Sequence, residues 1–157
     1  MSRSTRATLA LAAAGVAFDV VAYDYDPDAD RIGMQAAEAL AVSPSIVLKT
    51  LMAEVDGKPV CVVVPSDREV SMKKLAAAFK GKSAAMMKPA VAEKVTGYVV
   101  GGISPFGQKK SVPTVFEIEA MAHDLAYMNG GQRGLQVRLA PADAVAAAKA
   151  ITAAVIA

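Results

Sequence analysis

Cysteine and histidine are almost absent from this sequence of 157 residues, which contains one of each, Cys61 and His123. One cysteine cannot form an internal disulfide, and the pair cannot supply the four ligands of a structural zinc site. A serine, histidine and acid triad is disfavoured as well, because His123 lies beside Asp124 in a segment without a nucleophile-elbow pattern. A hydrolase built from this chain would therefore use no metal or cofactor, and would act through backbone donors, a lysine, water and groups of the substrate itself.

Long hydrophobic runs are also absent. Hydrophobic residues make up 54% of the chain, but alanine supplies much of this, and no apolar run approaches the roughly 20 residues of a membrane-spanning helix. We therefore expect a soluble protein without a membrane partner, and the single cysteine favours the reducing cytoplasm. The length fits one domain, residues 1–157, with one compact core.

The net charge of +2 is small, but basic and acidic side chains are separated along the chain. Residues 68–94 contain seven basic and two acidic side chains, whereas residues 19–30 contain five aspartates and no basic residue. A basic segment of this density is typical of a solvated helix face, and it also suits the docking of a phosphate-bearing substrate. Composition alone leaves both interpretations open.

The order of predicted elements mixes βα units with β-hairpins, which favours an α+β fold with a mixed sheet. Residues 46–55 and the apolar run 60–64 predict two strands joined by an Asp-Gly turn, with the second strand buried on both faces. Cys61 lies in that run, where a cysteine is most often a small buried hydrophobe. Residues 98–100 predict another strand, and a final helix is expected over about residues 141–155.

The stretch GGISPFGQKK at residues 101–110 fits neither a helix period nor a strand period, so it is expected to form a shaped loop. Adjacent glycines at positions 101 and 102 free the backbone from the restriction of a Cβ atom, and successive N–H groups can then converge on an anion or oxyanion. The Gly-Lys-Ser/Thr ending of a nucleotide phosphate loop does not follow them. An ordinary glycine-rich turn between strands is the alternative.

Four segments of the chain resemble a known family. They are YDYDP (23–27), VLKTL (47–51), TGYVVGGISPFGQKK (96–110) and NGGQRGL (129–135). Together they resemble the signature of YbaK-type Cys-tRNA(Pro) deacylases, which are relatives of the bacterial prolyl-tRNA synthetase editing domain, over about residues 18–141. The resemblance implies a single domain of this type with a mixed, barrel-like β-sheet and helices packed around it.

Lys49 interrupts an apolar run in a predicted strand, so its side chain must reach either a cavity or an exposed strand face. The resemblance favours a cavity, because this segment matches the one whose lysine is essential in the family. The substrate-binding residues that the resemblance implies are Tyr23, Ile32, Thr50, Ile103, Ser104 and Asn129. Ile32 and Asn129 depart from the phenylalanine and the serine that are usual at their positions, which leaves the amino-acid preference open.

The resemblance also implies a reaction in which the cysteine thiol of the substrate attacks its own ester carbonyl. Lys49 would engage the aminoacyl-adenosine end, and the N–H groups around Gly101 and Gly102 would bind the oxyanion. The expected partner is mischarged tRNA(Pro) and not DNA, with recruitment by prolyl-tRNA synthetase left open. The residues expected to bind the tRNA are Lys73, Lys74 and Lys80. Two alternatives remain: a sister factor that removes alanine or another small amino acid from tRNA(Pro), and a tRNA- or synthetase-binding module without activity.

Overall fold

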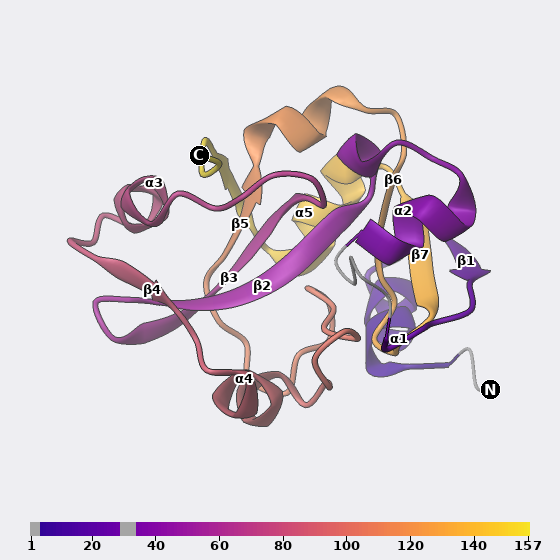
Figure 1. Ribbon diagram of the computed structural model, residues 1–157, viewed down its shortest axis with the longest axis horizontal. Helices are drawn as coiled ribbons and strands as arrows, with labels where there is room; N and C mark the ends of the chain where they lie inside the picture. Colours follow the sequence, from indigo (N-terminus) through magenta and orange to yellow (C-terminus); the bar gives the residue numbers. More distant parts are fainter. Residues whose placement is uncertain (1–3, 29–33) are drawn as a thin grey trace.

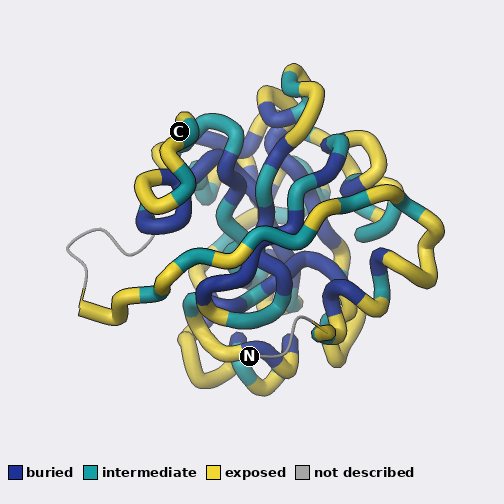
Figure 2. Tube along the Cα trace, turned by 90° about the vertical axis from the view of Figure 1, so that its right-hand side faces the viewer, coloured by how far each residue is buried: buried dark blue, intermediate teal, exposed yellow. Residues whose placement is uncertain are grey.

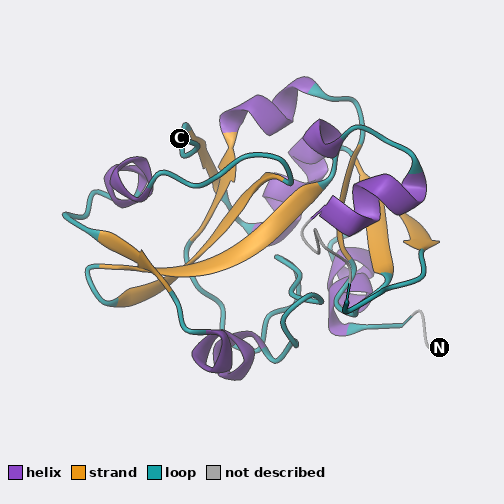
Figure 3. Ribbon diagram, viewed as in Figure 1, coloured by secondary structure: helices purple, strands orange, loops and turns teal. Residues whose placement is uncertain are grey.

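In the computed structural model, which describes residues 4–28 and 34–157, the strands form two sheets with helices packed around them (Figure 1, Figure 3). The strands are β1 (Asp19–Ala22), β2 (Leu48–Val55), β3 (Lys58–Pro65), β4 (Ala84–Met86), β5 (Thr114–Glu117), β6 (Ala126–Asn129), β7 (Leu135–Leu139) and β8 (Ile151–Ala153). The helices are α1 (Arg6–Ala13), α2 (Gln35–Leu40), α3 (Met72–Ala78), α4 (Pro89–Thr96) and α5 (Pro141–Ala148), with short 3-10 helices η2 (Pro44–Ile46) and η3 (Ile118–Ala122).

The larger sheet has the strand order β4-β2-β3-β5-β8. Strands β2 and β3 form the predicted antiparallel hairpin around the Asp-Gly turn, while β3, β5 and β8 run parallel. Strand β3 lies in the middle, and its residues from Val60 to Val64 are all buried. The prediction of a central strand covered on both faces is confirmed, because β3 supplies apolar side chains to a separate cluster on each face.

The smaller sheet is antiparallel, in the order β1-β7-β6. It meets the larger sheet where Val47, just before β2, forms an isolated parallel bridge with Tyr127 of β6. The α+β class with a mixed sheet is confirmed, but neither sheet closes on itself within the described ranges. The resemblance implied a barrel-like sheet, and the described strands form two open sheets that meet at this bridge.

Two hydrophobic clusters cover opposite faces of the larger sheet, because successive side chains of a strand alternate between faces. One face packs against α1, α4 and α5 through the cluster that contains Cys61 and Val63. The other face packs against α3, whose Leu75 contacts the cluster that contains Val62 and Val64. The buried core and the exposed loops around it are visible along the chain trace (Figure 2). None of the described helices has the length and apolar character needed to cross a membrane.

Residues 98–100 do not form the strand that the sequence predicts. Gly97 ends α4 in the left-handed conformation, and the Gly102 N–H donates to the carbonyl of Val99, which closes a turn. The Val100 N–H donates to the carboxylate of Glu93 instead of to a neighbouring strand. High strand propensity is overridden here because the segment only links α4 to the glycine loop.

The final helix is also shorter than predicted. Helix α5 ends at Ala148, because Lys149 adopts the left-handed conformation with φ of 53°. The chain then turns and Ile151–Ala153 pairs as β8 beside β5. Further on, the buried carboxylate of Glu117 accepts hydrogen bonds from the N–H groups of Val155 and Ile156, which holds the end of the chain against the sheet.

Candidate functional site

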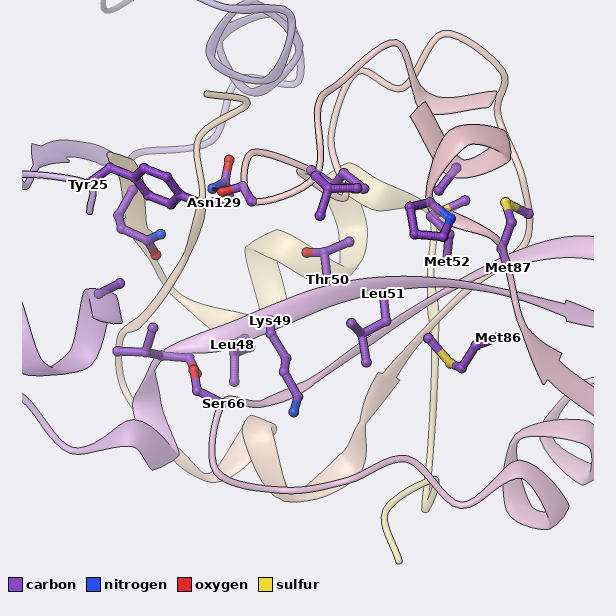
Figure 4. A pocket seen from close by; sticks show the side chains of 18 of the residues that line it. Tyr25, Leu48, Lys49, Thr50, Leu51, Met52, Ser66, Met86, Met87 and Asn129 are labelled. Carbon is purple, nitrogen blue, oxygen red and sulfur yellow. Dashed lines mark hydrogen bonds between the residues drawn. The ribbon is translucent and has the colours of Figure 1, made fainter. Parts of the chain in front are cut away.

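A cavity of about 310 Å³ lies along the open edge of β2 (Figure 4). Strand β4 pairs only with residues 53–55 of β2, and β6 meets this edge at the isolated bridge between Val47 and Tyr127, so residues 48–52 have no ladder partner on that side. The glycine loop, the ends of β6 and β7 and residues 86–92 provide the other walls. Most of the lining is apolar, with a few polar side chains, which is typical of a small-molecule site.

Lys49 and Thr50 both line this cavity, as expected, but their side chains leave β2 in opposite directions (Figure 4). The Lys49 ammonium lies 3.8 Å from the carboxylate of Glu69, whose side chain is 87% exposed. Such an exposed ion pair contributes little, so an incoming anion can displace Glu69. The Thr50 hydroxyl faces the side of the glycine loop and is buried without a hydrogen-bond partner among the described residues.

The glycine loop brings Gly101 and Ile103 to the cavity, whereas Gly102 and Ser104 lie behind it. The Gly102 N–H is used in the turn to Val99, so it is not a free oxyanion donor, contrary to the sequence-based expectation. Ser104 is fully buried, and its hydroxyl accepts from the N–H of Phe106. It therefore shapes the loop from inside, and Gly101 is left as the glycine that meets the cavity.

Asn129, a predicted pocket residue, connects the two loops that close the cavity. Its side-chain amide donates to the Gly101 carbonyl at 3.0 Å. Its side-chain oxygen accepts from the N–H of Gly131 at 2.7 Å and from that of Gln132 at 3.2 Å. These three hydrogen bonds fix the position of Gly101 relative to the end of β6, so Asn129 both lines the cavity and positions its wall.

Two tyrosines line the cavity, Tyr23 as predicted and Tyr25 in addition. Burial, followed by the nearby Tyr25, raises the pKa of Tyr23, so its hydroxyl stays protonated at neutral pH. The guanidinium of Arg133 lies 5.3 Å from the centre of the Tyr25 ring and donates to the carbonyl of Val100 at 2.9 Å. Ile32, another predicted pocket residue, lies outside the described residues.

The single cysteine is a core residue, as predicted. Cys61 is fully buried outside the cavity lining, and burial raises the pKa of its thiol to about 12, which rules out a thiolate at neutral pH. His123 also lies outside the lining. Within residues 4–28 and 34–157, no group of three histidine, cysteine, aspartate or glutamate side chains could hold a metal ion.

Several lining residues were not predicted from the sequence, notably Gln136, Ser66, Met86 and Met87. Gln136 is the informative one, because it is a buried polar side chain, whereas Arg138, the other polar residue of β7, is partly exposed. The residue order LQVRL contains this signal, since a glutamine flanked by strand-forming apolar residues lies on the face opposite to Leu135 and Val137. Which face borders a cavity depends on the neighbouring strands, and a local pattern does not show that.

Comparison with known proteins supports an editing domain. A family model described as "Aminoacyl-tRNA editing domain" matches residues 26–147. The EbsC protein of Enterococcus faecalis, whose proposed activity is that of a Cys-tRNA(Pro)/Cys-tRNA(Cys) deacylase, is 36% identical over 122 residues, which cover 76% of this chain and 74% of that protein. The uncharacterized protein YwhH of Bacillus subtilis is 29% identical over 108 residues, which cover 68% of each chain.

A solved structure has the same fold. The crystal structure of a proposed trans-editing enzyme for prolyl tRNA synthetase matches with a TM-score of 0.84 at 21% identity, over 99% of each chain. At 21% identity this structural match shows only that the fold is shared. The family is shown by the sequence matches to the editing-domain model and to EbsC. They confirm the predicted relationship: the chain belongs to the aminoacyl-tRNA editing domain family and is an aminoacyl-tRNA deacylase.

Proposed function

We propose that this protein removes cysteine from mischarged tRNA(Pro), as a free-standing editing enzyme formed by one domain, residues 1–157, in the cytoplasm. The observation that carries the proposal is a cavity that brings together Lys49, Thr50 and Gly101 and has no cysteine or histidine in its described lining. The activity named for EbsC supports cysteine as the amino acid. A site without a strong nucleophile of its own suits a substrate that supplies one.

In the proposed reaction the substrate thiol attacks its own ester carbonyl. A carbon–sulfur bond forms, the bond between the carbonyl carbon and the 3′ oxygen of the terminal ribose breaks, and the ribose oxygen leaves with the proton that the thiol gives up. The products are free tRNA and the cyclic thioester of cysteine, which water then opens. These reaction steps require no oxidant, no metal and no acyl group bound to the enzyme.

The chain positions the reacting groups rather than attacking the ester. Ser66 lines the cavity, but its hydroxyl donates to the carbonyl of Val47 and is held away from nucleophilic use. The Gly101 N–H, at the cavity wall, is the proposed donor to the developing oxyanion. Lys49 is proposed to bind the anionic adenosine end of the tRNA, because it is the one cationic side chain among the described residues of the lining.

The tRNA is proposed to approach over the face of the larger sheet that carries α3. Lys49 projects from β2 on the same side as Leu51, and Leu51 packs in the cluster that α3 covers. Phosphates that follow this face would pass the exposed Lys73 before reaching Lys49. Lys74 has a second role, since its ammonium donates to the carbonyl of Ile156 at 2.9 Å.

The double substitution Lys73→Glu/Lys80→Glu is expected to weaken tRNA binding and to flatten its salt dependence. Each lost phosphate contact lowers the slope of log Kd against log salt by about one. Titration of labelled tRNA(Pro) at several salt concentrations measures both effects. Lys58→Glu, at an exposed hairpin position, is the matched control and should change neither. Unchanged binding by the double variant would place the RNA on another surface.

Gly102→Ala is expected to lower deacylation about 10- to 100-fold, because displacing a catalytic loop by about 1 Å can have such an effect. A Cβ atom at this position would lie 2.9 Å from the backbone nitrogen of Arg133 and 3.1 Å from two backbone atoms of Gln132, so the two loops must separate. Single-turnover deacylation measures the loss. Gly15→Ala is the control: its φ of +73° costs stability, but nothing lies within 4 Å of the added atom, and its activity should persist.

The direct test is deacylation of a panel of charged tRNAs, with and without prolyl-tRNA synthetase. Cys-tRNA(Pro) should lose its amino acid many times faster than in buffer. Binding of Cys-tRNA(Pro) without turnover would instead identify a non-catalytic module. Turnover that appears only with the synthetase would show that the tRNA is selected through that partner.

A further inference from the structure

Gln136 lies in β7, the central strand of the smaller sheet, between Val21 of β1 and Asn129 of β6. Its side chain lines the cavity and is only 4% exposed, yet its Oε1 atom has no hydrogen-bond partner among the described residues. The Oγ1 atom of Thr50, in the wall formed by β2 (Figure 4), is buried without a partner in the same way. Two walls of one cavity therefore each present an unpaired polar oxygen.

An unpaired buried carbonyl oxygen costs free energy, and a site that binds water or a ligand offsets this cost. The cavity of about 310 Å³ has room for several waters, which would hydrate Gln136 in the free protein. A ligand that displaces such a water must present a hydrogen-bond donor in its place, or it loses affinity. The Oε1 atom only accepts, so it selects ligands with a donor at this point.

We propose that Gln136, together with Thr50, binds the α-amino group of the aminoacyl ester. The inference rests on the proposed function in one respect, that the ligand is an aminoacyl ester. The α-amino group carries two or three N–H bonds and, when protonated, no acceptor, so it needs several oxygens once it leaves water. The described lining contains no aspartate or glutamate, so neutral oxygens such as that of Gln136 must accept the hydrogen bonds of the amino group.

This contact would orient the ester. With the carbonyl oxygen at Gly101 and the amino group at Gln136, two substituents around the ester are fixed on different walls of the cavity. Gln136 is held on a rigid element, because β7 is hydrogen-bonded to a strand on each side. A residue in this position can place the amino group without moving on binding.

The test compares two stable ligands in calorimetric titrations. The first is 3′-cysteinylamino-3′-deoxyadenosine, whose amide cannot be deacylated, and the second is its 3-mercaptopropionyl counterpart, which lacks only the amino group. Gln136→Met keeps the length of the side chain and removes the acceptor. It should weaken binding of the first ligand about 10- to 100-fold, the range for one hydrogen bond to a charged group, and binding of the second by less than about twofold.

Two further variants and a melting curve separate binding from folding. Gln136→Glu keeps an oxygen acceptor and should recover most of the affinity for the first ligand. Gln132→Met, outside the cavity lining, should bind both ligands as the parent does. The Tm of Gln136→Met should equal or exceed that of the parent, because an unpaired buried acceptor has been removed. A clear fall in Tm would assign Gln136 to the fold and overturn the inference.

The inference would also be overturned if Gln136→Met weakened the binding of both ligands equally, or if the parent bound both ligands with equal affinity. Turnover of Cys-tRNA(Pro) by the parent tests the proposed function separately. If the parent distinguishes the two ligands through Gln136 but releases no cysteine from the tRNA, the function is wrong and the amino-group contact stands. If the parent releases cysteine but binds both ligands equally, the function stands and the contact is wrong.

Discussion

Lys49→Ala is expected to lower kcat/KM for Cys-tRNA(Pro) by about 100- to 1000-fold, the loss typical of removing a group that positions or electrostatically stabilises the reacting centre. Lys49 lines the cavity from a strand, and its ammonium lies 3.8 Å from the exposed carboxylate of Glu69. Because Lys49 lines the cavity and is not a member of either hydrophobic core cluster, the Tm should change little. Single-turnover deacylation and thermal unfolding measure the two quantities.

Two control variants test whether the position of the charge matters. Glu69→Gln removes the ion-pair partner and should leave activity unchanged or slightly raised, because Lys49 is then free for the substrate. Lys58→Ala removes a cation at the exposed hairpin and should have no effect. Wild-type turnover by Lys49→Ala would show that Lys49 has no role in the reaction. The proposed position of the adenosine end would then be wrong as well.

The part of the fold that could be predicted is the part in which local pattern and tertiary burial agree. The run from Val60 to Val64 is apolar throughout, and only a central strand buries both faces of such a segment. The Ser71 side chain caps α3 by accepting from the N–H of Lys74, as its place before a helical run indicates. In each case the residues that decide the structure are neighbours in the sequence.

The parts that could not be predicted depend on distant partners. Ile151–Ala153 follows an alanine-rich helix, and it becomes β8 because β5 offers a free edge more than thirty residues earlier. The contact between the two sheets likewise depends on the bridge between Val47 and Tyr127, which no local pattern encodes. Pairing between remote segments was the missing information in both cases.

The functional site also combines features that short sequence motifs predict with features that depend on distant parts of the chain. Lys49, Thr50 and Gly101 were found because a resemblance in short motifs marks them, and the structure brings them to one cavity. The role of the Gly102 N–H was misjudged, since a glycine pair suggests two free donors and the turn uses one of them. Gln136 was missed because its strand alternates correctly, and its lack of a partner becomes visible only once β6 and β2 are in place.

Ala-tRNA(Pro) is expected to be deacylated at least about 1000-fold more slowly than Cys-tRNA(Pro), although alanine is smaller and enters any cavity that admits cysteine. A lost group the size of a methylene changes discrimination by only about 1–3 kcal/mol, or about 10- to 200-fold. A larger ratio therefore has to come from missing chemistry, because alanine has no thiol to attack its own ester. Parallel single-turnover assays on the two tRNAs, with matched enzyme concentrations, give the ratio.

Cys61→Ala provides the enzyme-side counterpart of this comparison. If the attacking sulfur belongs to the substrate, the variant should deacylate Cys-tRNA(Pro) within about twofold of the parent, since the Cys61 thiol is fully buried and its pKa is about 12. A large loss of deacylation activity in a folded Cys61→Ala variant would instead indicate that Cys61 is the nucleophile. Efficient release of alanine by the parent would instead replace thiol attack with attack by water, and would favour the sister factor that clears alanine from tRNA(Pro).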